Sequence, residues 1–401
     1  MNNSTKMFIS GFKCFNNSNL ELRDLTVLTG NNGTGKSSLI QAILLTRLAI
    51  EKNLQHSSNE NYINDNWKGI PVPLNKGYEL KLGTVYDVFN NSKKYSGKKI
   101  TIKLDDEAYE FELPEKEETD TSVTFSFNPA KEKIDSIPFW RKKEFYYLHT
   151  ERLGPRQSLE SNYTDFVHCG HRGEYTAQVL LKNWNIKVTD QRKHKKAEGD
   201  NLRQNVDEWL KEICPGTSIS VKPLGEFSAQ IWVRNNSSSI ELLAPNIGFG
   251  ISYSLPIIVD GLIAKKGSVF IVENPEAHLH PKGQSNIGFF LGMVASAGVK
   301  VIIETHSEHV INGIIRAALS DTGLINDKIS VYFFSDAWEK DSTRKQEDKK
   351  VEKIENLIDD RIGAIMLKKN GDLYPYPKDF FDQVQQDLSL IYRLQKGSNN
   401  G

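Results

Sequence analysis

A glycine-rich segment near the start of the chain has residue types and a spacing that could bind phosphate. Residues 30–37 read Gly-Asn-Asn-Gly-Thr-Gly-Lys-Ser, which matches the pattern GxxxxGK[ST]. The glycines let the backbone wrap around phosphate groups and point its N–H groups at them. The lysine can reach the β- and γ-phosphates, and the serine hydroxyl can bind magnesium. We therefore expect ATP and Mg2+ to bind here, with Ser37 as a metal ligand. The expected ATP contacts are Asn31, Asn32, Gly33, Thr34, Gly35, Lys36, Ser37 and Ser38.

The flanking segments have the patterns of the two elements that must hold such a loop. Leu25–Thr29 is a short apolar run, which predicts a buried strand. Ser37–Ile50 carries leucine and isoleucine at helical spacing, which predicts a helix whose N-terminus faces the phosphates. The alternative is a chance glycine turn before a helix. Because strand, loop and helix follow one another in the order the motif requires, we favour a P-loop.

A second apolar run ends in an acid. Val269–Val272 predicts a buried strand that delivers Glu273 to its carboxyl end, as in a Walker B strand. Glu273 would hold magnesium, directly or through a water molecule. The histidines of the following turn, His278 and His280, are assigned to packing and turn formation. Their spacing and the lack of a clear third ligand argue against a metal site.

A third apolar run, Val301–Ile303, is followed by Glu304-Thr305-His306-Ser307. His306 could contact the γ-phosphate or orient the attacking water. A lone histidine at a strand end is more often structural. Its position after the glycine-rich loop and after Glu273 favours a role at the nucleotide.

The composition limits the classes of protein. Lys plus Arg and Asp plus Glu both number 51, so the net charge is zero and no overall basic field favours nucleic acid. Cys14, Cys169 and Cys214 form no CxxC pattern, so we expect neither a zinc cluster nor a disulfide framework. The apolar runs are far shorter than the roughly 20 residues that span a bilayer, and the first residues lack the pattern of a signal peptide. These features predict a cytoplasmic protein with no membrane partner.

The hydrophobic periodicity of the sequence changes along the chain and divides it into three parts. Residues 1–56 and 240–335 have α/β patterns and are interpreted as one split head. Residues 57–239 contain short alternating segments and predict a mixed α+β insertion that completes the head. Residues 336–401 predict a small C-terminal accessory element.

Further elements follow from the same periodicities. Helices are expected over Ser252–Ala264 and Pro281–Ala297, and strands over Lys99–Leu104, Tyr109–Leu113 and Ile329–Phe334. Residues 336–353 are dense in charge and predict an exposed loop. The tail, Tyr374–Leu390, predicts a turn followed by a short amphipathic helix.

Taken in order, these motifs resemble those of ABC-type AAA ATPases of the OLD (overcoming lysogenization defect) group. The P-loop is followed by a glycine-rich SxxLP segment, by ENPEAHLHP at 273–281 and by Thr-His-Ser at 305–307. Tyr374–Leu388 is similar to a C-terminal domain of unknown function in the subfamily with ENPEAHLHP. Gly11–Phe15, Glu151–Arg156 and Arg172–Tyr175 are also similar to segments of the group.

The resemblance implies an α/β fold with an ABC-type P-loop NTPase head. It implies that Gly248, Gly250 and Ser252 stand in the place of the ABC signature and contact ATP held by a second, head-to-tail copy of the chain. Lys13, in the opening strand–turn, would be a further nucleotide contact, and His306 would be the switch histidine. Many members lie in prokaryotic antiphage or plasmid-defence loci. This implies a separately encoded effector, such as a nuclease.

Two departures from the group bear on activity. The glutamate that usually polarises the attacking water directly follows the Walker B acid, and Asn274 stands there instead. Glu276 either replaces it, or caps the following helix while hydrolysis is slow. The catalytic candidates are thus Glu273, Asn274, Glu276 and His306. No DxD-like pair of a Toprim nuclease follows His306, so we expect no nuclease within this sequence.

Three functions stay open. The favoured one is an ATP-driven switch that closes as a homodimer or a higher homo-oligomer and controls the effector. The second is a DNA-binding ATPase of the repair or genome-maintenance type. The absence of sustained heptads in the sequence counts against it, and the basic run Arg192–Lys196 could contact phosphates or simply be solvated. The third is a slow ATP-binding scaffold, which Asn274 favours.

Overall fold

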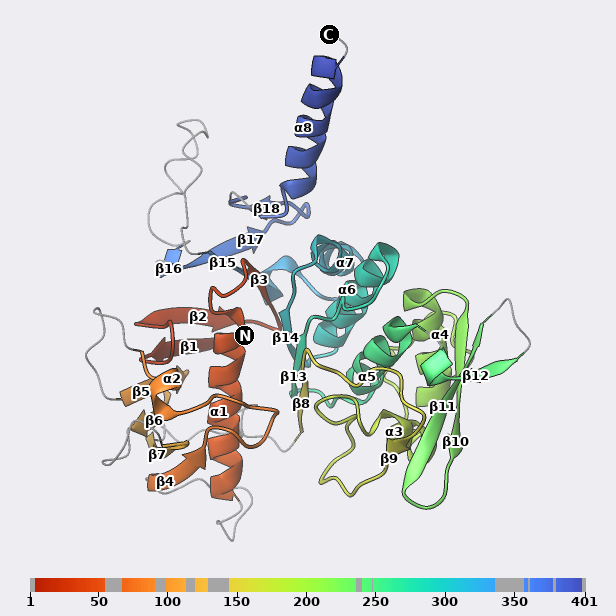
Figure 1. Cartoon of the computed structure of the whole chain (residues 1–401), viewed down its shortest axis with the longest axis horizontal. Helices are drawn as coiled ribbons and strands as arrows, with labels where there is room; N and C mark the ends of the chain where they lie inside the picture. Colours follow the sequence, from red (N-terminus) through yellow and green to blue (C-terminus); the bar gives the residue numbers. More distant parts are fainter. Residues whose placement is uncertain are drawn as a thin grey trace.

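The computed structural model describes residues 4–54, 67–90, 99–112, 120–128, 144–235, 240–246, 248–335, 357–359, 361–377 and 380–398. A parallel sheet runs through its centre (Figure 1). The strands of this sheet are β3 (Leu25–Gly30), β8 (Phe145–Leu148), β13 (Val269–Glu273), β14 (Lys300–Glu304) and β15 (Ile329–Phe334). They lie in the order β15-β3-β14-β13-β8. The strand before the P-loop and the strand that ends at Glu273 are therefore separated by β14.

Both faces of the central sheet are buried, which explains why its strands are continuous apolar runs. Along β13, Val269 and Ile271 face one hydrophobic core, and Phe270 and Val272 face the other. The first core lies under α1 (Lys36–Leu54) and an antiparallel sheet, and the second lies under the remaining helices of the head. This arrangement confirms the α/β P-loop head expected from the sequence.

A six-stranded antiparallel sheet covers the α1 side (Figure 1). Its members are β1 (Thr5–Ser10), β2 (Ser18–Leu22), β4 (Trp67–Pro73), β5 (Lys99–Leu104), β6 (Glu107–Glu112) and β7 (Ser122–Asn128), with the short α2 (Val85–Val88) beside them. Their order is β2-β1-β5-β6-β7-β4. The predicted antiparallel pair in the insertion is confirmed as β5 and β6, and β5 also pairs with β1. Strands from the predicted insertion and from the N-terminal segment thus share one sheet.

Helices lie on the other side of the central sheet (Figure 1). They are α3 (Thr176–Lys182), α4 (Leu202–Ile213), α5 (Phe249–Ile263), α6 (Pro281–Ser296) and α7 (Glu308–Leu319). The prediction for α6 is confirmed within one residue, but the predicted start of α5 at Ser252 is wrong. Gly248 is the N-cap, so the glycine-rich segment forms the first helical turn rather than a loop. Pro256 lies inside the helix, where its missing N–H removes one backbone bond.

Smaller elements lie at the two ends of the head. A four-stranded sheet beside α3 and α4 contains β9 (Leu159–Glu160), β10 (Thr217–Pro223), β11 (Ser228–Asn235) and β12 (Glu241–Leu243). At the other end, β17 (Ile362–Leu367) pairs antiparallel with β15, and β16 (Leu357–Asp359) and β18 (Leu373–Tyr374) pair with β17. The predicted charged loop, 336–353, lies outside the described residues.

The last helix, α8 (Gln383–Ser398), projects away from the head in Figure 1. The sequence correctly predicts a helix after the turn in the tail, but the helix continues eight residues beyond the expected end at Leu390. Within the ranges that the structure describes, no helix is both long and apolar enough to cross a membrane.

Candidate nucleotide-binding site

The loop between β3 and α1 has backbone angles that require glycine. Gly30, Gly33 and Gly35 have φ values of +127°, +76° and +116°. A Cβ atom on Gly30 would lie 2.1 Å from the carbonyl oxygen of Phe334, and one on Gly35 would lie 2.6 Å from Sγ of Cys14. Side chains at these two positions would thus clash with the packed neighbours as well as strain the backbone. The glycines of the motif are fixed by the geometry of the loop.

Lys36 begins α1 and folds back over the loop. Its side chain is buried, and Nζ donates to the carbonyl oxygens of Gly30 at 2.9 Å and Asn31 at 2.6 Å. Burial lowers the pKa of Lys36, and the negative charge of Glu304 partly opposes this. The loop is also braced by Thr34, whose Oγ1 donates to the carbonyl oxygen of Asn31 at 2.7 Å. An ammonium group is therefore held at the centre of the loop, where phosphates would lie.

Asn31, Asn32, Gly33 and Ser37 are exposed, and Ser38 is partly buried. Lys13 lies beside the same helix, because its Nζ donates to Oε1 of Gln41 at 2.6 Å, one helical turn after Ser37. Burial lowers the pKa of Lys13 as well. The predicted P-loop contacts and Lys13 thus gather around the start of α1.

The acid nearest to the P-loop serine is Glu304, to which the sequence analysis gave no role. Ser37 Oγ donates to Oε1 of Glu304 at 2.9 Å. Glu304 ends β14, is buried, and lies opposite Glu273 in the register of the two strands. Burial, followed by the charge of Glu273, raises the pKa of Glu304 to about 7. The signal that pointed to Glu273, an acid at the end of an apolar strand, was present at Glu304 too.

Glu273 is buried at the end of β13, and both of its oxygens have partners. Tyr147 donates its hydroxyl to Oε1 at 2.9 Å. Thr150 donates to Oε2 from Oγ1 at 2.7 Å and from its backbone N–H at 3.3 Å. The carboxylate is thereby fixed beside Glu304 and not against Ser37. Among the described residues, Oε1 accepts only from Tyr147, so it keeps an acceptor position with which Glu273 could bind magnesium directly or through a water molecule.

The turn after Glu273 is strained and tied to β14. Asn274 has φ of +43°, and its backbone N–H donates to the carbonyl oxygen of Glu304 at 2.8 Å. Glu276 accepts from Thr305 Oγ1 and from the backbone N–H of His306, both at 2.8 Å. Burial raises the pKa of Glu276. The N-cap of α6 is His280, so of the two alternatives for Glu276 the one in which it caps this helix is wrong.

His306 lies near the lysine of the P-loop. Partial burial lowers its pKa, and the positive charge of Lys36 lowers it further, so the imidazole is neutral at pH 7. The other two histidines have structural contacts, as predicted. His278 packs on Tyr253, with ring centroids 4.6 Å apart, and His280 Nδ1 accepts from the N–H of Lys282 at 3.4 Å. The acids of β13 and β14, Lys36 and His306 thus form one cluster at the carboxyl edge of the sheet.

The donor set of this cluster fits ATP with magnesium. Oε2 of Glu304 is buried and makes no hydrogen bond within the described part of the chain, so it is a free oxygen beside Ser37. Among the described residues, no three His, Cys, Asp or Glu side chains could hold a metal ion on their own. Mg2+ at a nucleotide takes one or two protein oxygens, waters and phosphate oxygens, so the Ser37 hydroxyl and this oxygen of Glu304 are suitable ligands.

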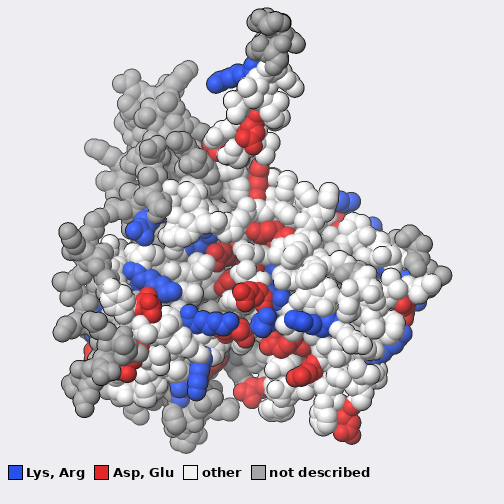
Figure 2. Space-filling model, in the orientation of Figure 1, with Lys and Arg blue, Asp and Glu red and all other residues white. Residues whose placement is uncertain are grey.

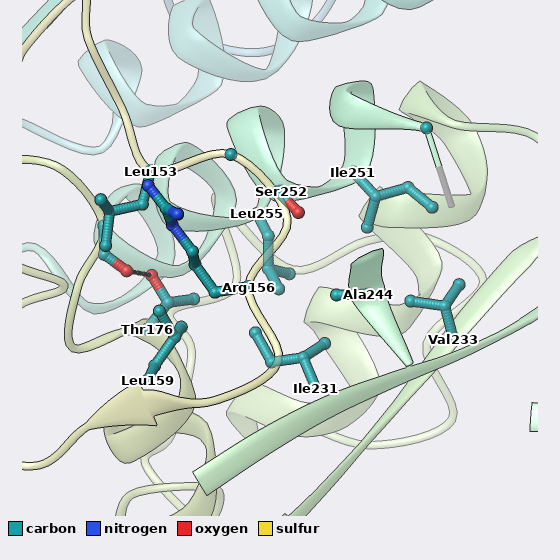
Figure 3. A pocket seen from close by; sticks show the side chains of 13 residues that line it. Leu153, Arg156, Leu159, Thr176, Ile231, Val233, Ala244, Ile251, Ser252 and Leu255 are labelled. Atoms are coloured by element: carbon teal, nitrogen blue, oxygen red, sulfur yellow. Dashed lines mark hydrogen bonds between the residues drawn. The ribbon is translucent and has the colours of Figure 1, made fainter. Parts of the chain in front are cut away.

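The segment that resembles the ABC signature lies apart from the P-loop of the same chain. Gly248 is exposed and caps α5, and Gly250 packs so tightly that a Cβ atom would lie 2.8 Å from the carbonyl oxygen of His278. Ser252 lines a small pocket whose other walls are mostly aliphatic, and Arg156 is among its lining residues (Figure 3). No hydrogen bond within the described ranges connects these three residues to residues 30–37.

The basic run Arg192–Lys196 is partly a packing element. Arg192 and His194 are buried, and Arg192 Nη1 donates to the carbonyl oxygens of Gly261 and Ala264 at 2.8 and 2.6 Å. Only the lysines of the run reach solvent. On the face drawn in Figure 2, acidic and basic side chains are interspersed rather than gathered into one basic surface.

Two family matches cover the elements that build this cluster. Residues 25–170, which include the P-loop, match the family described as "AAA domain, putative AbiEii toxin, Type IV TA system". Residues 173–311, which include α5, Glu273 and His306, match the family described as "AAA ATPase domain". Two successive segments of the chain thus match models of AAA-type ATPase domains. The OLD subgroup is not distinguished by these matches and stays a prediction.

The chain is also similar to solved heads of SMC proteins. A SMC head bound to the C-winged helix domain of ScpA is 12% identical, with a TM-score of 0.46 over 91% of this chain and 98% of that one. The SMC head domain from Thermotoga maritima is 12% identical, with a TM-score of 0.40 over 83% and 95%. A Smc head with an extended coiled coil, bound to the C-terminal domain of ScpA derived from Pyrococcus furiosus, is 10% identical, with a TM-score of 0.45 over 91% and 96%. No curated protein matches the chain.

Proposed function

We propose that the protein binds and hydrolyses ATP and that ATP closes a head-to-tail dimer that controls a separate effector. The observation that carries the ATPase proposal is the contact between Ser37 and Glu304, which joins the P-loop to a cluster of buried acids. In this proposal the backbone N–H groups of the loop bind the phosphates, and Lys36 neutralises the β- and γ-phosphates. Ser37 and Glu304 hold magnesium, with Glu273 behind them. Magnesium would supply charge neutralisation at the phosphates.

Glu276 is the proton acceptor in this proposal. An amide such as Asn274 can orient water but cannot take its proton, whereas the raised pKa of the Glu276 carboxyl brings it closer to that of an effective base at neutral pH. Glu276 is fixed by Thr305 and by the backbone of His306, so its position is set by the residues that follow β14. Neutral His306 can donate or accept a hydrogen bond at the γ-phosphate or the water.

The dimer is proposed because the exposed start of α5 is a candidate for a second phosphate contact. Gly248 is exposed and Phe249 is 50% exposed, and a helix N-terminus with accessible N–H groups attracts anions. A single P-loop leaves the outer face of the γ-phosphate uncovered, and a second copy could cover it. The role in antiphage defence and the separate nuclease rest on the resemblance to the OLD group. The description of the family that matches residues 25–170, which names a toxin of a toxin–antitoxin system, is compatible with them.

Steady-state phosphate release from the purified chain tests the ATPase proposal. Wild type should hydrolyse ATP in a magnesium-dependent manner. Lys36→Ala should weaken ATP binding tenfold or more by calorimetry and abolish turnover, since it removes the charge that faces the phosphates. Glu276→Gln should retain binding and lower the single-turnover rate by about a hundredfold.

The exposed Glu226→Gln is the matched control for both variants and should behave as wild type. Turnover that survives Lys36→Ala would overturn the proposal. A strong increase in turnover with added DNA would instead favour the DNA-binding ATPase, and a Glu276→Gln rate within twofold of wild type would favour the scaffold.

A further inference from the structure

We infer that Arg152 is a positioning residue that fixes the turn after Glu273 and connects this turn to the start of α5. The inference rests on the proposed ATPase function and adds a residue to it. Arg152 lies in a loop about 120 positions before the turn, and nothing in the P-loop or Walker B patterns points to it.

The guanidinium of Arg152 binds backbone carbonyls rather than carboxylates. Nη1 donates to the carbonyl oxygen of Glu273 at 2.7 Å and to that of His149 at 3.0 Å. Nη2 donates to the carbonyl oxygen of Asn274 at 2.6 Å. The residue is only 2% exposed, so these bonds form away from water. The two carbonyls of Glu273 and Asn274 are consecutive, and both face one planar fork.

This geometry suits arginine and the unusual backbone of the turn. Asn274 adopts the left-handed region, and its carbonyl oxygen accepts both from Arg152 and from the backbone N–H of Ala277 at 3.1 Å, which closes the turn. A planar guanidinium can bond the carbonyls of Glu273 and Asn274 at once, whereas an ammonium group has no such fork. Burial lowers the pKa of Arg152 to about 10, which leaves the group charged at neutral pH. The positive charge of Arg152 lies near Glu273 and Glu276. It thus adds to the charge of Lys36, which lies near Glu304 in the same carboxylate cluster.

The same side chain reaches the start of α5. The guanidinium carbon lies 5.2 Å from the ring centroid of Tyr253, which is in the second turn of α5. Tyr253 packs on His278, which follows Asn274 in the same turn, and Gly250 is in close contact with the carbonyl of His278. Arg152, the turn and the first turns of α5 are therefore one packed unit. Movement of Glu273 or Glu276 would therefore displace the N-terminus of α5, which we propose faces a second copy of the chain.

Another buried arginine offers a matched control. Arg192 is 5% exposed and also donates to two backbone carbonyls, those of Gly261 and Ala264. Burial lowers its pKa to about 10, as for Arg152. Arg192 acts at the far end of α5, away from the acids. Its replacement should thus reproduce the loss of burial and hydrogen bonding without disturbing the turn.

The test compares Arg152→Gln with Arg192→Gln in the full-length chain, by melting temperature, ATP affinity and steady-state kinetics. If Arg152 positions the acids, Arg152→Gln lowers kcat at least tenfold relative to Arg192→Gln, while KM and the calorimetric Kd for ATP stay within threefold. Arg152→Lys retains the charge without the fork and should recover only part of the loss. A kcat for Arg152→Gln within twofold of that for Arg192→Gln overturns the inference.

Three further outcomes separate the role of Arg152 from folding and from the proposed ATPase function. If Arg152→Gln does not fold, Arg152→Lys and Arg192→Lys take its place, and equal kcat values within twofold again overturn the inference. If turnover survives in Lys36→Ala, the proposed ATPase function fails. If Lys36→Ala abolishes turnover and the two arginine variants are equivalent, only the role of Arg152 fails.

Discussion

Replacing Glu304 by glutamine should stabilise the protein in the absence of nucleotide, and only at neutral to alkaline pH. Glu304 titrates at about 7 in the folded chain instead of its ordinary 4.5, because it is buried next to Glu273. The folded state therefore binds a proton that the unfolded state has lost, and stability falls as pH rises from 4.5 through 7. Above that window the ionised carboxylate costs the fold about 3 kcal/mol. Glutamine avoids this cost and can still accept the hydrogen bond from Ser37.

Thermal unfolding with EDTA, at pH 5 and at pH 8, measures the effect. With an unfolding entropy of about 2.1 cal/mol/K per residue, 3 kcal/mol corresponds to a Tm difference of roughly 4 °C in a chain of 401 residues. Glu304→Gln should match wild type at pH 5 and melt about 4 °C higher at pH 8. The exposed Glu226→Gln should show no such difference. An equal shift at both pH values, or a lower Tm at pH 8, would refute the reasoning.

Three other variants test the loop and the dimer. Gly35→Ala places a Cβ atom at φ of +116° and 2.6 Å from Sγ of Cys14, so ATP affinity measured by calorimetry should fall at least tenfold. At Gly33 an added Cβ atom meets open space, so Gly33→Ala should lose less ATP affinity than Gly35→Ala. Equal losses of affinity in the two variants would show that the clash at Gly35 is unimportant. Ser252→Arg puts bulk and charge at the start of α5, so the monomer should retain ATP binding but lose ATP-dependent association in sedimentation. An absence of ATP-dependent association in wild type would count against the head-to-tail dimer.

The sequence predicts the local parts of the site because each part is a short pattern. Leu25–Gly30 and Val269–Glu273 are apolar runs buried on both sides, and the glycines of the loop are needed at fixed positions. Chain order alone does not tell which strand lies beside which. β14 lies between β3 and β13, and this is why Glu304 and not Glu273 contacts Ser37.

Longer-range contacts and competing signals account for the rest. The bonds from Arg152 to Glu273 and Asn274 join positions about 120 apart, and no periodicity reports such a pair. The start of α5 was misplaced because Gly248 and Gly250 resemble a loop, whereas Gly248 serves as the N-cap. The three-part domain division, the OLD subgroup and the role of Ser252 stay predictions.

Substitutions of Asn274 test whether asparagine at this position avoids electrostatic repulsion among the neighbouring carboxylates. Its backbone has φ of +43°, a region that asparagine tolerates better than glutamate, and its Oδ1 atom is buried with no hydrogen bond in the part of the chain that the structure describes. Asn274→Glu would restore the usual catalytic residue, but it would also add a carboxylate beside Glu273, Glu276 and Glu304. The left-handed backbone of glutamate should cost roughly 1 kcal/mol of stability and the buried like charge another 1 to 3 kcal/mol, so we expect a Tm lower by about 2 to 5 °C at pH 8.

Asn274→Gln separates the two effects, because it has the backbone penalty without the charge. If Asn274→Glu is as stable as Asn274→Gln at pH 8, repulsion among the acids is not what asparagine avoids. If it also hydrolyses ATP faster, the lack of a base at 274 is what limits turnover.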